Sequence, residues 1–198
     1  MVQNIQTILD KWLEIDFYYV ADKIGFIKKD VLPDKKLIME TIRCLDYITT
    51  RRKEEEKNIT ITLIALMWTY IDKKEYDIKA IVIKFLSRIG YPTSAIIVDD
   101  MFDKDECKFS AIDSLIDQIT IGFNQMKNEV NIGEHTLLLT DFQKRIWDVM
   151  DNEKVIGISA PTSAGKSYVI LMKVIQRLNV EKLDVVYIVP TLSLLNQV

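Results

Sequence analysis

The chain of 198 residues is 48% hydrophobic and 28% charged, with six glycines and four prolines. This composition excludes collagen-like and low-complexity chains and predicts a globular protein of one or two small domains. The formal net charge of −3 also excludes a strongly basic protein that holds nucleic acid by charge alone.

The sequence offers no clear segment for a membrane or for secretion. The uncharged stretch at 58–71 has 14 residues, fewer than the roughly 20 apolar residues that a membrane-spanning helix needs. The opening MVQNIQTILD has no basic region followed by an apolar run, so we expect no signal peptide. Cys44 and Cys107 alone make neither a disulfide framework nor a metal site, which is typical of a reducing compartment. We therefore expect a cytoplasmic protein.

The first 135 residues have the periodicity of helices. Apolar residues recur every three or four positions, as on one helical face, in the ranges 5–20, 78–89 and 112–130. Two further helices are expected at 35–50 and 59–71. The charged run between them is interpreted as a solvated helix end and loop. These patterns predict an all-helical accessory domain over residues 1–135.

From about residue 136 the pattern changes to that of an α/β domain. Residues 140–150 predict a short helix with one apolar face. They precede VIGISA at 155–160, a loop of small residues, an apolar helix to about residue 179, and VVYIVP at 185–190. Continuously apolar strands joined by a helix are typical of a parallel sheet buried on both faces. We therefore predict the start of a doubly wound α/β domain, with a partial parallel sheet, in residues 136–198.

The segment APTSAGKS at 160–167 has the spacing of a phosphate-binding P-loop, with alanine in place of the first glycine. Small residues let successive backbone N–H groups turn toward a phosphate, and the following helix adds its positive end. The cradle would consist of Pro161, Thr162, Ser163, Ala164 and Gly165. We expect Lys166 to contact the β- and γ-phosphates as the catalytic residue, and the Ser167 hydroxyl to bind Mg²⁺. The alternative is an ordinary turn that contains an incidental lysine.

The residues around this loop point to a family. APTSAGKS followed by VVYIVPTLSLLNQV resembles motifs I and Ia of superfamily 2 DExH-type helicases, over about residues 140–198 only. The resemblance implies a RecA-like domain that binds ATP with Mg²⁺ and, in the full-length protein, single-stranded DNA or RNA. It places Pro190 at the end of the second strand and Thr191 on a nucleic-acid phosphate. The same residues are similar to the large helicases of bacterial anti-phage defence systems of the Hachiman kind.

Gln143 has two interpretations. A glutamine amide offers one donor and one acceptor, which complement the N7 acceptor and N6 donor of adenine. Its position before the P-loop strand resembles that of the adenine-reading glutamine of these helicases, so we expect it to bind ATP. The alternative is structural, because Thr140 and Gln143 have the T-x-x-Q spacing of a capping box at a helix start.

Two other polar groups are interpreted as structural. IIVDD at 96–100 ends in two carboxylates, but Asp99 and Asp100 precede the P-loop, whereas the metal-orienting acid of the helicase family follows it. A solvated acidic loop is the better interpretation of that segment. His135 is the only histidine and lies in the expected linker, so no chemistry is assigned to it.

The DExH acids and the second helicase lobe are absent from these 198 residues. We therefore expect the N-terminal piece of a larger ATP-hydrolysing helicase, which binds nucleotide weakly and unwinds nothing by itself. One alternative is a helical module that docks a partner protein through residues 1–135 and has a secondary nucleotide site. Another is a P-loop phosphotransferase or a different class of NTPase, against which the Pro190-Thr191 pair argues.

Overall fold

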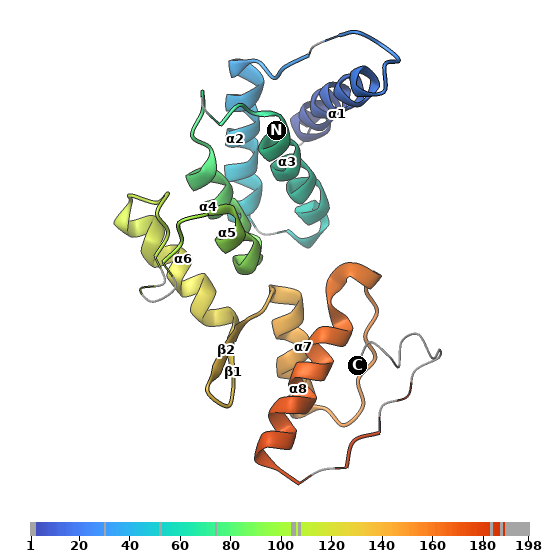
Figure 1. Cartoon of the computed structure of the whole chain (residues 1–198), viewed down its shortest axis with the longest axis vertical. Helices are drawn as coiled ribbons and strands as arrows, with labels where there is room; N and C mark the ends of the chain where they lie inside the picture. The colour runs from blue at the N-terminus through green and yellow to red at the C-terminus, as the bar shows by residue number, and fades with distance from the viewer. Residues whose placement is uncertain are drawn as a thin grey trace. The chain divides into compact units, whose positions relative to one another are not determined.

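A computed structural model of the chain describes residues 3–29, 31–51, 53–73, 75–103, 106, 108–182, 184–186 and 188. It forms two compact units. The first consists of Met1–Asn128 and Leu138–Asp141, and the second of Glu129–Leu137 and Phe142–Val198. Figure 1 colours the chain from blue to red in sequence order.

The first unit is helical, as the periodicity predicts. Its α-helices are α1 (Gln3–Lys23), α2 (Lys35–Arg51), α3 (Lys57–Tyr70), α4 (Lys79–Arg88), α5 (Pro92–Val98) and α6 (Leu115–Asn128), and a short 3₁₀ turn, η1 (Glu54–Glu56), precedes α3. The expected helices at 35–50 and 59–71 are therefore confirmed within two residues at each end. The expected helix at 112–130 is shorter than predicted, because α6 ends at Asn128 and Val130 lies in a strand.

The larger core of this unit is organised around Trp12. The Trp12 side chain is fully buried among apolar residues of α1, α2, α3 and α4. Its indole Nε1–H donates to the Thr41 hydroxyl at 2.8 Å, and that hydroxyl donates in turn to the Leu37 carbonyl at 2.7 Å. A buried indole needs such an acceptor, since an unpaired N–H would lose its hydration without replacement. One polar chain therefore fixes α1 against α2.

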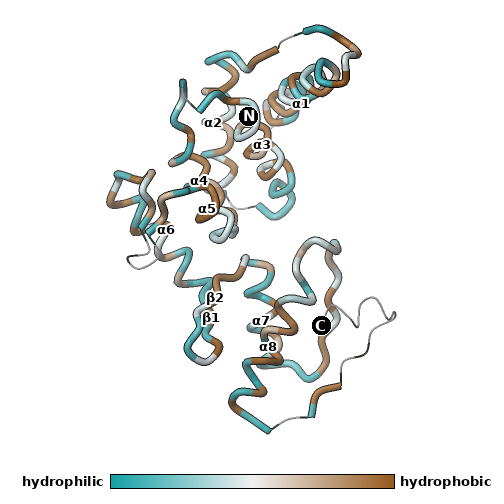
Figure 2. Tube along the Cα trace, viewed as in Figure 1, coloured by the Kyte–Doolittle hydropathy of each residue, from teal (hydrophilic) through white to brown (hydrophobic). Residues whose placement is uncertain are grey.

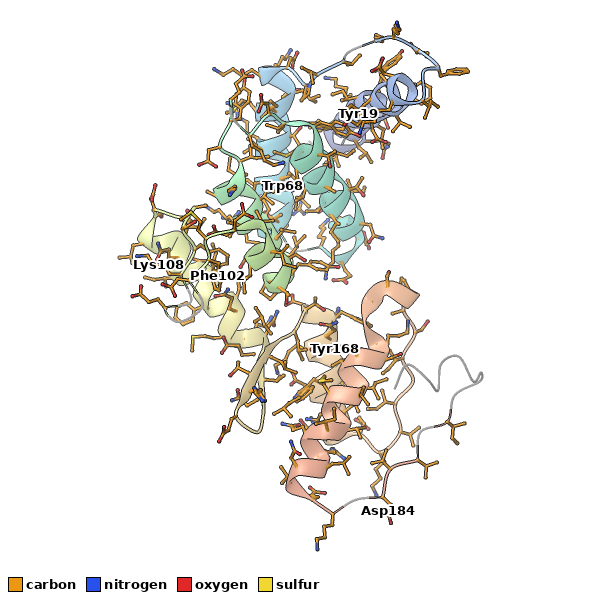
Figure 3. All side chains as sticks on the ribbon, in the orientation of Figure 1. Tyr19, Trp68, Phe102, Lys108, Tyr168 and Asp184 are labelled. Atoms are coloured by element: carbon orange, nitrogen blue, oxygen red, sulfur yellow. The ribbon has the colours of Figure 1, made fainter. Side chains whose placement is uncertain are left out.

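Asp99 does not lie in a solvated acidic loop, and that expectation was wrong. α5 ends at Val98, and the Asp99 carboxylate is buried beneath the loop that follows. It accepts hydrogen bonds from both the backbone N–H and the hydroxyl of Ser110, each at 2.6 Å, and from the Met101 N–H at 3.2 Å. The carboxylate replaces lost water with protein donors, so it anchors the loop between α5 and α6. In the same loop, the ring centroids of Phe102, which Figure 3 labels, and Phe109 lie 4.8 Å apart.

Apart from Leu138 and Asp141, the second unit holds the hairpin of β1 (Glu129–Ile132) and β2 (His135–Leu138) and the helix α7 (Asp141–Asn152). It also holds a 3₁₀ turn, η2 (Thr162–Ala164), and the helix α8 (Lys166–Val180). The hairpin was not predicted, and His135 belongs to a strand instead of a linker. Its two-residue turn begins at Gly133, whose φ of 59° is left-handed. Glycine adopts this conformation without steric cost, which favours a tight hairpin.

The predicted parallel sheet is not formed by the described residues. Residues 155–160 are irregular, and Val155 is 90% exposed. In 185–190, the described positions Val185, Val186 and Ile188 are irregular and exposed as well. The described residues Val185, Val186 and Ile188 are nevertheless hydrophobic, as are Val155 and Ile156 of the first segment (Figure 2). A parallel strand, however, needs backbone partners from elsewhere in the chain, and the described residues of these two segments form no strand pairing with other described residues.

Candidate nucleotide-binding site

The phosphate-loop segment forms a turn that leads directly into α8. Thr162–Ala164 make the 3₁₀ turn η2, and Gly165 follows with φ 73° and ψ 27°. This left-handed conformation strains most residues that carry a β-carbon, so the backbone favours glycine at this position. α8 then begins at Lys166. The unpaired N–H groups of the first turn of α8 therefore face the end of the loop, where the helix dipole favours an anion.

The Lys166 side chain forms hydrogen bonds to the backbone of its own loop. Its ammonium donates to the carbonyl oxygens of Ala160 at 2.5 Å and Pro161 at 2.6 Å. The side chain is half-buried, whereas Ser167 in the first turn of α8 is exposed. Tyr168, labelled in Figure 3, is exposed beside it. A cation thus lies among the small residues of the loop, next to an accessible hydroxyl, as a phosphate with its magnesium ion would require.

Gln143 lies against this loop. A β-carbon added to Gly165 would collide with the Nε2 atom of Gln143, so the amide group occupies the space beside the glycine. The structure therefore brings together residues separated by a loop and a helix. Thr140 directly precedes α7 and Gln143 is the third residue of that helix, so the spacing of a capping box is retained as well.

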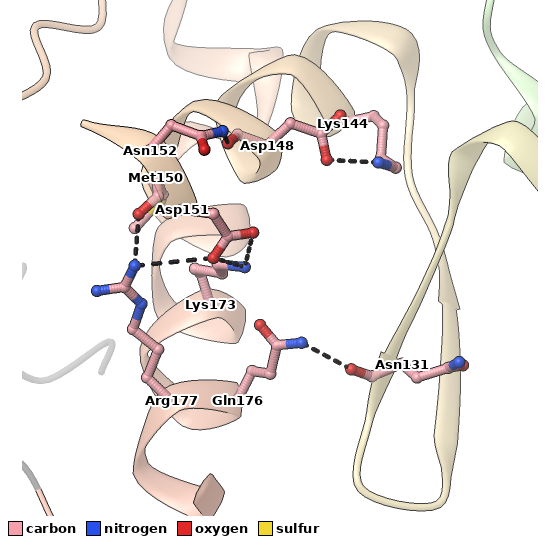
Figure 4. Close-up of polar contacts among 9 residues, drawn as sticks. All are labelled: Asn131, Lys144, Asp148, Met150, Asp151, Asn152, Lys173, Gln176 and Arg177. Atoms are coloured by element: carbon pink, nitrogen blue, oxygen red, sulfur yellow. Dashed lines mark hydrogen bonds and ion pairs between the residues drawn. The ribbon is translucent and has the colours of Figure 1, made fainter. Parts of the chain in front are cut away.

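The contacts that join α7 to α8 were not predicted from the sequence. Among the described residues they include the cation–π contact of Lys173 with Trp147. They also include the ion pairs of Lys173 and Arg177 with Asp151, which Figure 4 shows. On α7 these residues follow Gln143 at four and eight residues, and on α8 they follow Lys166 at seven and eleven. This spacing identifies residues on one face of each helix. It does not indicate which residue of α7 meets which residue of α8.

The remaining predicted site residues are not tested by the structure. Pro190 and Thr191, expected on nucleic acid, lie outside the described residues. The Thr162 side chain is not described either. Within the described parts of the chain, histidine, cysteine and acidic side chains form no group of three or more that could hold a metal ion. Ser167 therefore stays the one predicted magnesium ligand.

One similarity to known proteins lies in the C-terminal region. Residues 140–198 match the family model for DEAD/DEAH box helicases. The match begins just before α7, so Gln143 and the whole loop lie within the DEAD/DEAH box segment. No curated protein and no solved structure matches the chain.

The DEAD/DEAH box match indicates a helicase-type, ATP-dependent function. Proteins of this family generally use ATP with Mg²⁺ and bind nucleic acid. Residues 1–139 lie outside the match. Among the described residues, no helix combines the length and the apolar character needed to cross a membrane.

Proposed function

We propose that the second unit binds ATP with Mg²⁺ through the loop at 160–167, as the nucleotide site of a DEAD/DEAH box helicase. The observation that carries the proposal is the loop geometry. Gly165 is left-handed, Lys166 lies within the loop, and α8 starts at once behind them. The backbone N–H groups and the helix dipole supply an anion site that needs few charged side chains.

Phosphate binding would require Lys166 to exchange partners. Its ammonium now donates to two loop carbonyls, and it would turn from them to phosphate oxygens. Hydrogen bonds between charged groups are stronger than those to neutral carbonyls. The exchange is therefore favourable when a polyphosphate enters, and it opens the loop at the same time. Ser167, exposed on the first turn of α8, is the residue that would hold Mg²⁺.

Adenine recognition is assigned to Gln143. Its amide lies beside Gly165, at the edge of the loop that would hold the phosphates. A glutamine amide can pair with both the N6 and N7 edge groups of adenine. Guanine carries an acceptor, O6, where adenine carries a donor. The site should therefore prefer ATP over GTP.

The residues expected on nucleic acid follow from the helicase resemblance. We assign Thr191 to a phosphate of single-stranded DNA or RNA and Pro190 to the end of the preceding segment. The helical region 1–135 would serve as an accessory domain of the full-length helicase, which residues 136–198 would begin. The similarity of both motifs to Hachiman-type helicases extends the proposal to anti-phage defence. Loss of phage protection in a host carrying Lys166→Ala would test that role.

Titration with a fluorescent ATP analogue and Mg²⁺ tests the nucleotide site. We expect Lys166→Ala to weaken binding by roughly tenfold or more, since hydrogen bonds to charged groups contribute about 1.5–3 kcal/mol. Lys182→Ala, an exposed lysine beyond the far end of α8, is the matched control and should bind normally. Equal affinity of Lys166→Ala and the native chain would overturn the assignment.

A second candidate function is protein docking by the first unit. α6 exposes an apolar stripe along one face, formed by Leu115, Ile116, Ile119, Phe123 and Met126. Exposed apolar surfaces of this kind mark interaction sites more often than chance. Affinity purification of the native chain and of Phe123→Glu would test this function. A partner lost only from the variant supports it, and identical sets of partners contradict it.

A further inference from the structure

A buried lysine joins the two helices of the candidate site. Lys173, in the middle of α8, is only 2% exposed. Its ammonium lies 2.7 Å from both carboxylate oxygens of Asp151 on α7. It also lies 4.4 Å from the centre of the Trp147 ring, which is a cation–π contact. Because a buried charge is costly unless it is paired, both partners hold the ammonium in place.

Arg177 extends this attachment by one turn of α8. Its Nη2 atom donates to the Met150 carbonyl at 2.6 Å and lies 3.7 Å from Asp151 Oδ1 (Figure 4). Met150 belongs to the last turn of α7, where carbonyl groups have no partner within the helix. The guanidinium therefore caps the C-terminal end of α7. Lys173 and Arg177 together attach that end of α7 to α8.

The attachment lies on the same helical faces as the nucleotide residues. Lys173 follows Lys166 by seven residues, which is two turns of α8 and roughly 10 Å along its axis. Trp147 and Asp151 follow Gln143 by four and eight residues on α7. Residues at these spacings share a face. The angle at which α7 lies on α8 therefore fixes where Gln143 meets the loop.

We propose that Lys173, held by Trp147 and Asp151, is a positioning residue that orients α7 on α8 and so presents Gln143 to adenine. This inference rests on the proposed nucleotide site. Lys173 lies two turns from the phosphate loop, so it acts through Gln143 and does not touch the nucleotide. The phosphate contacts belong to α8 and its own loop, which Lys173 leaves unchanged. Lys173 should therefore affect the preference for adenine over guanine and not the affinity for the phosphates.

Lys173→Met is the informative variant. Methionine keeps much of the length and apolar character of the lysine stem but removes the charge that holds Asp151 and Trp147. Asp151 is half exposed on its other side, so water can solvate it once the lysine is gone. We expect the preference for ATP over GTP to fall at least about fivefold, the lower end of what a paired amide contributes to base discrimination. Affinity for GTP should stay within about twofold.

Isothermal titration calorimetry of the full chain with Mg-ATP and with Mg-GTP measures this preference as the ratio of the two dissociation constants. Lys173→Arg keeps a cation that can pair with Asp151 and lie over the Trp147 ring, so it should retain the preference. Lys144→Met is the matched control. The Lys144 ammonium lies 2.5 Å from Asp148 of its own helix, α7, and among the described residues it has no polar contact with α8. This variant should behave as the native chain does. If Lys173→Met does not fold, Asp151→Asn replaces it and should show the same loss.

A double-mutant cycle separates positioning from general loss of structure. In a Gln143→Ala background, Lys173→Met should cause no further loss of preference, since Lys173 acts through that amide. A purely structural role would instead lower ATP and GTP affinity together, and would add to the effect of Gln143→Ala. That additive result, or an unchanged preference in folded Lys173→Met, would overturn the inference.

Failure of the inference is distinguishable from failure of the proposed function. If Lys166→Ala binds ATP as tightly as the native chain does, the phosphate site itself is wrong. If only Lys166→Ala weakens binding while the native chain binds ATP and GTP equally, the phosphate site stands. In that case Gln143 does not read adenine, and the positioning role of Lys173 is overturned.

Discussion

The amide of Gln143 occupies the space beside Gly165 that a β-carbon on residue 165 would need. Gly165 is therefore constrained twice, by its left-handed backbone and by this neighbour. The relationship links the residue proposed to read the base to the loop proposed to hold the phosphates. A substitution at Gly165 should therefore shift the Gln143 amide, and a substitution at Gln143 should alter the surroundings of the loop.

Gly165→Ala should weaken ATP binding and reduce the preference for ATP over GTP. The alanine would cost roughly 1–2 kcal/mol in the left-handed conformation and would displace the Gln143 amide. We expect an affinity loss of about tenfold, measured by titration with both nucleotides. Gly157→Ala is the control, because its φ is not left-handed and no atom lies within 4 Å of an added β-carbon. Native affinity in Gly165→Ala would contradict the geometry.

Thr41→Val should destabilise the first unit. It removes the acceptor of the buried Trp12 indole N–H and leaves that donor unpaired. The expected loss in the free energy of unfolding is about 1–3 kcal/mol, measured by urea denaturation. Thr62→Val removes an exposed hydroxyl whose described hydrogen bond goes to the Asn58 carbonyl in its own helix, and should cost much less. Equal losses in the two variants would argue against the role of Trp12.

Asp99 should make stability depend on acidic pH. Burial by itself raises its pKa, but hydrogen bonds from Ser110, Met101 and Ala111 outweigh that effect and hold the pKa below its ordinary value of 3.8. A carboxyl with a lowered folded-state pKa stabilises the protein above the unfolded-state value, and this stabilisation is lost as pH falls through the folded-state value. Urea denaturation below pH 4 should therefore show a steeper loss in the native chain than in Asp99→Asn. Asp100→Asn, at an exposed carboxylate paired with Lys79, should retain the native slope.

Tyr70 should have a raised pKa and should stabilise the fold until its phenol ionises at alkaline pH. Burial and the hydrogen bond that its hydroxyl donates to Asp16 raise its pKa to about 12. In the unfolded chain the phenol ionises near pH 10, so the stabilisation is complete below that value and disappears as pH rises toward 12. Between pH 9 and 12, the melting temperature of the native chain should fall more steeply with pH than that of Tyr70→Phe. Matching slopes would show that the phenol is not coupled to Asp16.

Much of the helical part could be predicted from the sequence because helical periodicity is local. The faces at 5–20, 35–50, 59–71 and 78–89 each correspond to a helix of the structure. The hairpin at 129–138 was missed, because its strands of four residues are too short for a reliable alternation. Asp99 was misjudged for a related reason. Its donors lie eleven residues away, beyond any local pattern.

The candidate site divides in the same way. Gly165, Lys166 and Ser167 are neighbours in the chain, so residue type and spacing were enough to propose what they do. The strands expected around them depend on distant backbone partners, and the described residues at 155–160 and 185–188 remain irregular. Strand formation is decided by pairing more than by propensity.

The sequence by itself determined where helices form and where a phosphate would be held, since both depend on residues within a few positions of one another. Only the tertiary structure decided that Gln143 reaches Gly165, that Lys173 is buried between Trp147 and Asp151, and that Trp12 finds Thr41. These partners are separated by a loop or by whole helices. Which of them meet is set by how the helical faces pack, and packing depends on the shapes of all the side chains together.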